Sequence, residues 1–248
     1  MALMRTSNPA LNRDSFQAEH VMGETMTLPG TVNKTGILLL CTAATAIWTW
    51  NQFMRDRSPD AVLPMIAIGG IGGFVVALVT IFKKSWSPVT APAYALLEGL
   101  VLGSLSAMLE LRFPGIAIQA VGLTFGTLFA LLIAYRAGVI RATEHFKLGV
   151  IAATGGIALF YIVTMILSLF GVHVFGAFYG AGPIGIGFSI FVVIIAALNL
   201  VLDFDLIENG ARSGAPKYME WYGAFALMVT LIWLYFEILR LLAKTRRR

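Results

Sequence analysis

The hydrophobic positions of the chain form long, continuous runs that are separated by short polar segments. Seven of these runs reach the roughly 20 apolar residues that a helix needs to cross the hydrocarbon core of a bilayer. They lie at 31–51, 60–82, 91–109, 115–135, 148–170, 182–204 and 219–242. Because the runs are continuous rather than alternating, they are typical of helices and not of barrel strands. The pattern predicts an all-α integral membrane protein, with one seven-transmembrane-helix bundle over residues 31–242.

The composition supports this class and excludes others. Hydrophobic residues make up 58% of the chain and charged residues 12%, and the charged share is about half that of a typical soluble domain. The net charge of +5 does not indicate nucleic-acid binding, because many cations gather in residues 240–248, where they suit anionic lipid headgroups. The single cysteine, Cys41, lies inside an apolar run, which excludes an intrachain disulfide and a cysteine-ligated metal site.

Both ends of the chain are polar. Residues 1–30 lack the apolar core that follows a basic start in a signal peptide. We therefore expect a cytosolic N-terminal tail that is partly disordered, with a short segment around Met26 docked on the bundle. Residues 243–248 are expected to form a basic C-terminal tail.

The distribution of lysine and arginine predicts the orientation of the bundle. If the N-terminus is cytoplasmic, the outer side holds only Arg55, Arg57 and Arg112 in its loops. The cytosolic side then holds Arg5, Arg13, Lys34, Lys83, Lys84, Arg136, Arg141, Lys147, Arg212 and Lys217. With seven spans, the basic end at 243–248 lies on the outer side, whereas lysine and arginine normally gather on the cytoplasmic side. We weigh the early helices more heavily and expect a cytoplasmic N-terminus.

Three of the spans carry two glycines four residues apart, a spacing that lets neighbouring helices approach closely. The pairs are Gly69/Gly73, Gly99/Gly103 and Gly122/Gly126. We expect them to pack within the bundle rather than to form a dimer interface, so the protein is expected to be a monomer or a weak oligomer.

Glu98 is the least expected charge in the spans. It lies about seven residues into its run, roughly 10 Å deep at 1.5 Å per residue, among apolar neighbours. A charge in hydrocarbon costs roughly 2.5–3.5 kcal/mol even on mild insertion scales. We expect Glu98 to face the bundle interior, either as a neutral structural acid or as part of an ion or proton path.

More carboxylates lie at the same depth. Asp203 and Asp205 end the sixth span and Glu220 begins the seventh. The two aspartates are about 200° apart on a helix, so one is expected to face the bundle and the other the headgroups. Carboxylates that converge from different helices would suit a hard cation, and Asp203 with Glu98 is the candidate calcium site. The alternatives are that Asp205 is a solvated cap residue and that Glu220 pairs with Lys217.

The remaining candidates are structural. Glu237 precedes Arg240 by three residues, a spacing that favours an ion pair on one helix face. The sequence contains no metal-ligand histidine cluster, nucleophile motif or phosphate-binding loop, so we expect neither an enzyme nor a cofactor.

Several segments resemble the Bax inhibitor-1 / YccA family. They are residues 94–103 (YALLEGLVLG), 119–127 (QAVGLTFGT) and 199–205 (NLVLDFD). Residues 7–10 and 215–224 are similar to its longer bacterial branch. The resemblance implies a bundle whose last helix is central and surrounded by the other six, in a bacterial inner (plasma) membrane.

The resemblance also implies a pH-sensitive calcium leak. In family members of this kind, an aspartate near the end of the sixth span pairs with an aspartate in the seventh, and a glutamate of an earlier span lies on the pore. Asp203 matches the first position and Glu98 the third. The second falls near Thr230, which cannot ionise, so a substitute partner would have to come from Glu98, Asp205 or Glu220.

Two hypotheses of function follow. The first is a calcium-permeable leak channel that is gated by protonation around Asp203, with Glu98, Asp205 and Glu220 along the ion pathway. The alternative is a regulatory partner that modulates a membrane-anchored protease through the N-terminal tail. A proton-coupled transporter is less favoured, because no internal repeat or interrupted helix pair is evident.

Overall fold

The computed structural model describes residues 24–171 and 176–247. Within this part of the chain, seven helices are long and apolar enough to cross a membrane. They are α2 (Leu28–Asp56), α3 (Leu63–Phe82), α4 (Ser87–Arg112), α5 (Ile116–Arg136), α6 (Glu144–Leu169), α8 (Pro183–Arg212) and α9 (Met219–Arg246). Short helices η2 (Pro59–Ala61), η3 (Lys84–Trp86) and α7 (Gly176–Tyr179) lie in the connections. The predicted seven-helix bundle is confirmed.

Several helices extend beyond their apolar runs. Thr27 caps α2, and its Oγ accepts a hydrogen bond from the Gly30 N–H at 3.0 Å, which satisfies one of the free N–H groups of the first turn. The helix α8 continues to Arg212, well past the predicted end at 204, because helical hydrogen bonding continues where hydropathy stops. The helix α9 likewise includes most of the expected basic tail at 243–248. Residues 1–23 of the expected N-terminal tail lie outside the described residues.

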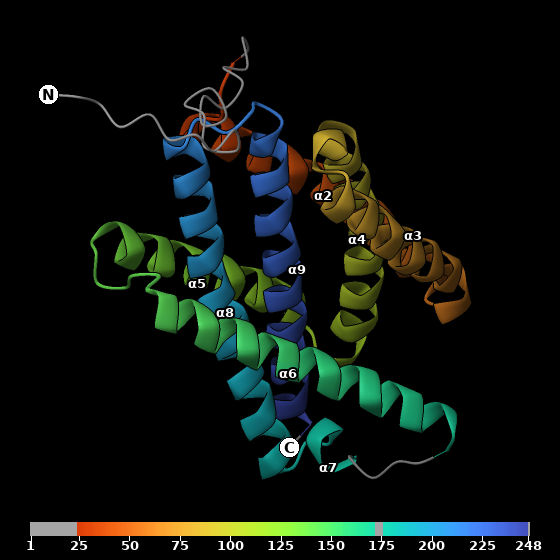
Figure 1. Cartoon of the computed structure of the whole chain (residues 1–248). Helices are drawn as coiled ribbons and strands as arrows, with labels where there is room; N and C mark the ends of the chain where they lie inside the picture. The colour runs from red at the N-terminus through yellow and green to blue at the C-terminus, as the bar shows by residue number, and fades with distance from the viewer. Residues whose placement is uncertain (1–23, 172–175, 248) are drawn as a thin grey trace, which may run out of the picture.

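The helix α9 forms the core of the bundle. In the most apolar window of each span, 56% of the α9 residues are buried, against 17% in α3 and in α6. It packs against α2, α4, α5 and α8, and its Leu231, Leu234 and Leu239 belong to a large buried cluster. Figure 1 shows α8 beside α9 and α6 running obliquely across both. The expected central position of the last helix is confirmed.

Two of the three glycine pairs hold neighbouring helices together. A Cβ at Gly99 or Gly103 of α4 would collide with backbone atoms of α2, at Thr42 and Ala46 respectively. Gly69 of α3 lies equally close to the backbone of α4. The helices α2, α4 and α3 therefore form a tightly packed row.

The third glycine pair was predicted wrongly. A Cβ at Gly122 or Gly126 of α5 would have no atom within 4 Å, and both residues are exposed. The reason is that α5 turns a different face toward α8 and α9, which carries Ile116, Ala120 and Leu128.

Candidate functional site

Asp203 lies in α8 and faces α9. The side chain that faces its carboxyl group is Thr230 of α9, and Oδ2 of Asp203 is buried without a hydrogen-bond partner. The surroundings are apolar, because Leu200 and Phe204 of α8 and Leu231 of α9 belong to the buried core. A buried carboxyl oxygen without a partner is costly, so this group is suited to exchange a proton or to attract a cation.

Asp205 points to a different part of the structure. Its Oδ2 pairs with Lys147 Nζ at the start of α6 at 2.9 Å and accepts a hydrogen bond from Asn209 Nδ2 at 2.9 Å. The predicted split between an inward and an outward aspartate is therefore confirmed. Asp205 takes part in an ion pair at the end of the bundle rather than in the Asp203 site.

Glu98 lies between α4 and α3. Its Oε1 is 2.9 Å from the position that a Cβ at Gly73 would take, so the absence of a side chain there makes room for the carboxyl group. Among the described residues, Glu98 makes no hydrogen bond or ion pair. It is half-buried at the side of α4 that α3 covers, and α3 is a peripheral helix that packs mainly on α4.

The proposed pair of calcium ligands is not brought together. Glu98 faces α3, whereas Asp203 faces Thr230 of α9. In the part of the chain that the structure describes, no three His, Cys, Asp or Glu side chains are grouped so that they could hold a metal ion. Counting along each helix gives an expected depth for both acids, but depth alone does not determine which neighbour a side chain faces.

Glu220 anchors the start of α2 to the start of α9. It is fully buried, and its Oε1 accepts hydrogen bonds from Thr27 N–H at 2.9 Å and Thr27 Oγ at 2.8 Å. Lys34 Nζ approaches Oε2 at 2.6 Å as a charge contact outside hydrogen-bond geometry. Gly30 has no Cβ, and one there would overlap the Glu220 carboxyl group. Glu220 therefore serves as an anchor, with its oxygens already engaged.

The expected pair between Glu220 and Lys217 is confirmed, at 3.2 Å. Its hydrogen bond to Glu220 raises the pKa of Lys217. As long as Glu220 is ionised, the pair therefore stabilises the fold below the usual lysine pKa of about 10.4, and this contribution is lost as the pH rises further.

The segment before α2 is docked as expected. Met26 is buried, and its N–H donates to the Ala215 carbonyl at 2.7 Å. Thr25 forms an isolated antiparallel bridge with Pro216. These contacts fix the start of α2 on the connection between α8 and α9.

Lys244 is a buried cation that the sequence analysis assigned to a basic tail. Its Nζ donates to the carbonyls of Phe178 and Gly185 at 2.8 and 3.0 Å and to Ser189 Oγ at 2.9 Å. This assignment was wrong, because α9 continues past the apolar run and places the Lys244 ammonium group among these three acceptor oxygens. One helical turn before it, the expected pair between Glu237 and Arg240 is confirmed at 3.0 Å.

A comparison with models of protein families matches residues 8–247 to the family described as Bax inhibitor 1 like. The comparisons with curated proteins and with solved structures give no match.

Proposed function

Because the chain belongs to the Bax inhibitor 1 like family, we propose that it is a pH-sensitive, calcium-permeable leak channel of a bacterial inner membrane. Its N-terminus is cytoplasmic in this proposal, and protonation of Asp203 gates the path. The observation that carries the proposal is the buried Oδ2 of Asp203, which has no hydrogen-bond partner in the interface between α8 and α9.

The gating step follows from the surroundings of Asp203. When the carboxyl group is ionised, Thr230 faces it but Oδ2 has no hydrogen-bond partner among the described residues, so water or a cation must stabilise the remaining charge. When it is protonated, that requirement disappears and the apolar interface can close around it. A change in the protonation of Asp203 thereby controls whether a cation can pass along α8 and α9.

Because Thr230 carries no carboxylate, the proposed switch involves fewer protons. The resemblance implied a second aspartate near this position, and the structure places the Thr230 side chain against Asp203. A pair of carboxylates titrates as a coupled unit with two macroscopic steps. With threonine at this position, the proposed sensor at Asp203 takes up one proton. Glu98 is a separate carboxylate in this proposal, with its own effect on cation entry.

Replacing Asp203 with asparagine is expected to remove the pH dependence of the leak. The measurement is calcium flux into proteoliposomes from roughly pH 6 to 8, where one titrating group gives a several-fold change. Asp203→Asn should give a flux that no longer changes with pH, and Glu98→Gln should change the size of the flux. The matched control is Asp205→Asn, which removes the same charge two residues away and should keep the pH dependence. An unaltered pH profile in Asp203→Asn, or no flux at any pH, would contradict the proposal.

The docked segment before α2 favours a second candidate function, a regulatory partner of a membrane-anchored protease. The contacts of Thr25, Met26 and Thr27 fix this segment on the connection between α8 and α9 and on Glu220.

Deleting residues 1–23 is expected to abolish recovery of such a protease while calcium flux continues. The deletion stops before Thr27, so it keeps the bond to Glu220 and leaves the fold intact. The measurement is co-purification with detergent-solubilised membrane proteases, alongside the flux assay. Recovery of a protease by the shortened chain would exclude the tail as the binding element.

A further inference from the structure

A groove runs between α2 and α5. The helix α2 packs against α4 and α9, and α5 packs against α8 and α9, but α2 and α5 are not major packing partners of each other. Two cavities, of about 1240 and 900 Å³, lie in this gap. Both are lined by Gly36 and Leu39 of α2 and by Phe125 of α5, so they adjoin. We call them together the α2–α5 groove. Each is as large as, or larger than, most small-molecule sites, which have about 300–1,000 Å³.

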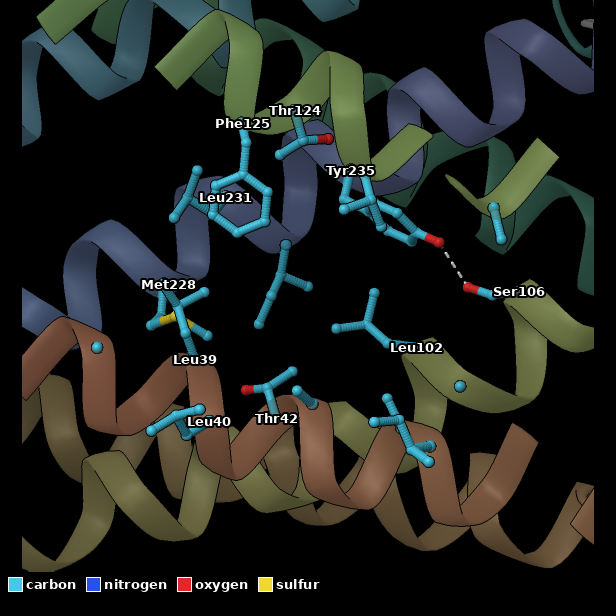
Figure 2. A pocket seen from close by; sticks show the side chains of 18 of the residues that line it. Leu39, Leu40, Thr42, Leu102, Ser106, Thr124, Phe125, Met228, Leu231 and Tyr235 are labelled. Carbon is cyan, nitrogen blue, oxygen red and sulfur yellow. Dashed lines mark hydrogen bonds between the residues drawn. The ribbon is translucent and has the colours of Figure 1, made fainter. Parts of the chain in front are cut away.

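The larger cavity is apolar. Figure 2 shows Leu40 of α2, Phe125 of α5, and Met228 and Leu231 of α9 around it. Four of its hydroxyl groups are paired within the protein: those of Ser106 and Tyr235 lie 2.7 Å apart in a hydrogen bond, and those of Thr42 and Thr124 donate to backbone carbonyls. This lining suits a hydrocarbon chain.

The mouth of the groove lies on the outer surface of the bundle. Val32 and Leu40 line the larger cavity, and they are 68% and 72% exposed. Since this surface of a membrane helix faces lipid, a lipid chain can enter the groove from the side.

The smaller cavity has a basic rim at the end of the bundle where α2 begins. Its charged residues are Arg136, Arg141, Asp205, Glu208 and Arg212. Both acids have partners, because Asp205 pairs with Lys147 and Glu208 with Arg212 at 2.6 Å. Among the described residues, the side chains of Arg136 and Arg141 form no ion pair or hydrogen bond. Lys147 also pairs with Glu144, so four cations face three acids, and the excess of one positive charge lies with the unpaired Arg136 and Arg141.

We infer that the α2–α5 groove binds one anionic phospholipid. Its phosphate lies against Arg136 and Arg141, and its acyl chains extend along the apolar lining. Basic pockets between membrane helices recognise anionic headgroups in this way. From Arg136 to Thr124, a residue that lines the larger cavity, α5 rises about 18 Å, slightly more than half of a hydrocarbon core of about 30 Å. The groove therefore has the length of one acyl chain.

The groove adjoins the proposed leak path, because Phe204 and Leu231 line it, but it does not include the carboxylates of that path. Neither Asp203 nor Glu98 lines the groove. Lipid binding and calcium flux can therefore be tested independently.

The experiment is a titration of the purified protein with phosphatidylglycerol, followed by native mass spectrometry. Phosphatidylcholine and inorganic phosphate are titrated in parallel to separate an intact anionic lipid from a zwitterionic lipid and from a free anion. The headgroup variant is Arg136→Gln with Arg141→Gln, and its matched control is Lys83→Gln with Lys84→Gln. These control lysines do not line the groove.

A second variant fills the groove itself. A Cβ at Gly36 would have no atom within 4 Å and Gly36 lines both cavities, so Gly36→Phe is chosen to place a ring in the groove. Its control is Gly70→Phe in α3, which also has free space but does not line the groove. Thermal unfolding of all variants in detergent verifies that each is folded.

The expected result is one retained phosphatidylglycerol per chain. The double arginine variant should bind it at least about tenfold more weakly, since each cation near an anionic headgroup contributes roughly fivefold. Gly36→Phe should lose the adduct, and both controls should keep it. Binding that is equal for phosphatidylcholine, displaced fully by inorganic phosphate, or unchanged in both variants would overturn the inference. A dimer that replaces the lipid adduct would overturn it as well.

Discussion

Gly103→Val is expected to destabilise the bundle by about 2–3 kcal/mol, the usual cost of overfilling a tightly packed interface. The carbonyl oxygen of Ala46 lies where a Cβ would be placed, and a backbone atom cannot move aside without moving α2. The helices α2 and α4 must therefore separate along their contact. The measurement is thermal unfolding of the protein in detergent.

Gly122→Val is the matched control for this prediction. It makes the same substitution in another Gly-x-x-x-Gly pair, at a position with no atom within 4 Å of the added Cβ. Its effect should stay within about 0.5 kcal/mol, as for most exposed positions. Equal effects at Gly103 and Gly122 would show that helix propensity, rather than close packing, decides the outcome.

Glu220→Ala is expected to have the second large effect, a loss of about 3 kcal/mol, at the lower end of the range for breaking a buried ion pair. The substitution leaves the Lys34 ammonium without its carboxylate partner and the Thr27 N–H without its acceptor. The lower end applies because the Lys34 side chain is 19% exposed and can turn partly toward water. Both the thermal midpoint and the resistance of residues 24–30 to protease should fall.

Glu144→Ala provides the comparison for Glu220. Glu144 also pairs with a lysine, Lys147 at 3.3 Å, but its side chain is 84% exposed. Exposed pairs contribute at most about 1 kcal/mol, so this variant should unfold close to the wild type. If Glu220→Ala unfolds no earlier than Glu144→Ala, the anchor does not stabilise the bundle.

The number and order of the membrane helices could be predicted because bilayer thickness demands long apolar runs. The helix ends could not be predicted equally well, since a helix continues as long as its backbone bonds are satisfied, whatever the side chains. Lys244 shows the consequence, because the hydropathy of the last span ends at 242 while the helix continues to Arg246. A residue that was predicted to lie in a basic C-terminal tail is therefore buried.

Contacts between distant residues were the part that the sequence could not provide. Glu220 was correctly paired with Lys217, three residues away, but its partner Thr27 lies 193 residues from it along the chain. The depth of Glu98 and Asp203 followed from counting along each helix, whereas their facing directions depend on how α3 and α9 pack. The position of Thr230 opposite Asp203 was reached through family resemblance, which carries three-dimensional information that spacing lacks.

The central position of α9 also determines the order in which the protein can assemble. This helix follows α2, α4, α5 and α8 in the sequence, yet it supplies the surface on which all four pack. During synthesis, the earlier helices enter the bilayer before their common partner exists. Until α9 is inserted, faces such as that of Ala196 and Leu200 are covered only by lipid or by other early helices. The row of α2, α4 and α3 can pack before that point, whereas the core around α9 forms only once the chain beyond residue 219 has been made.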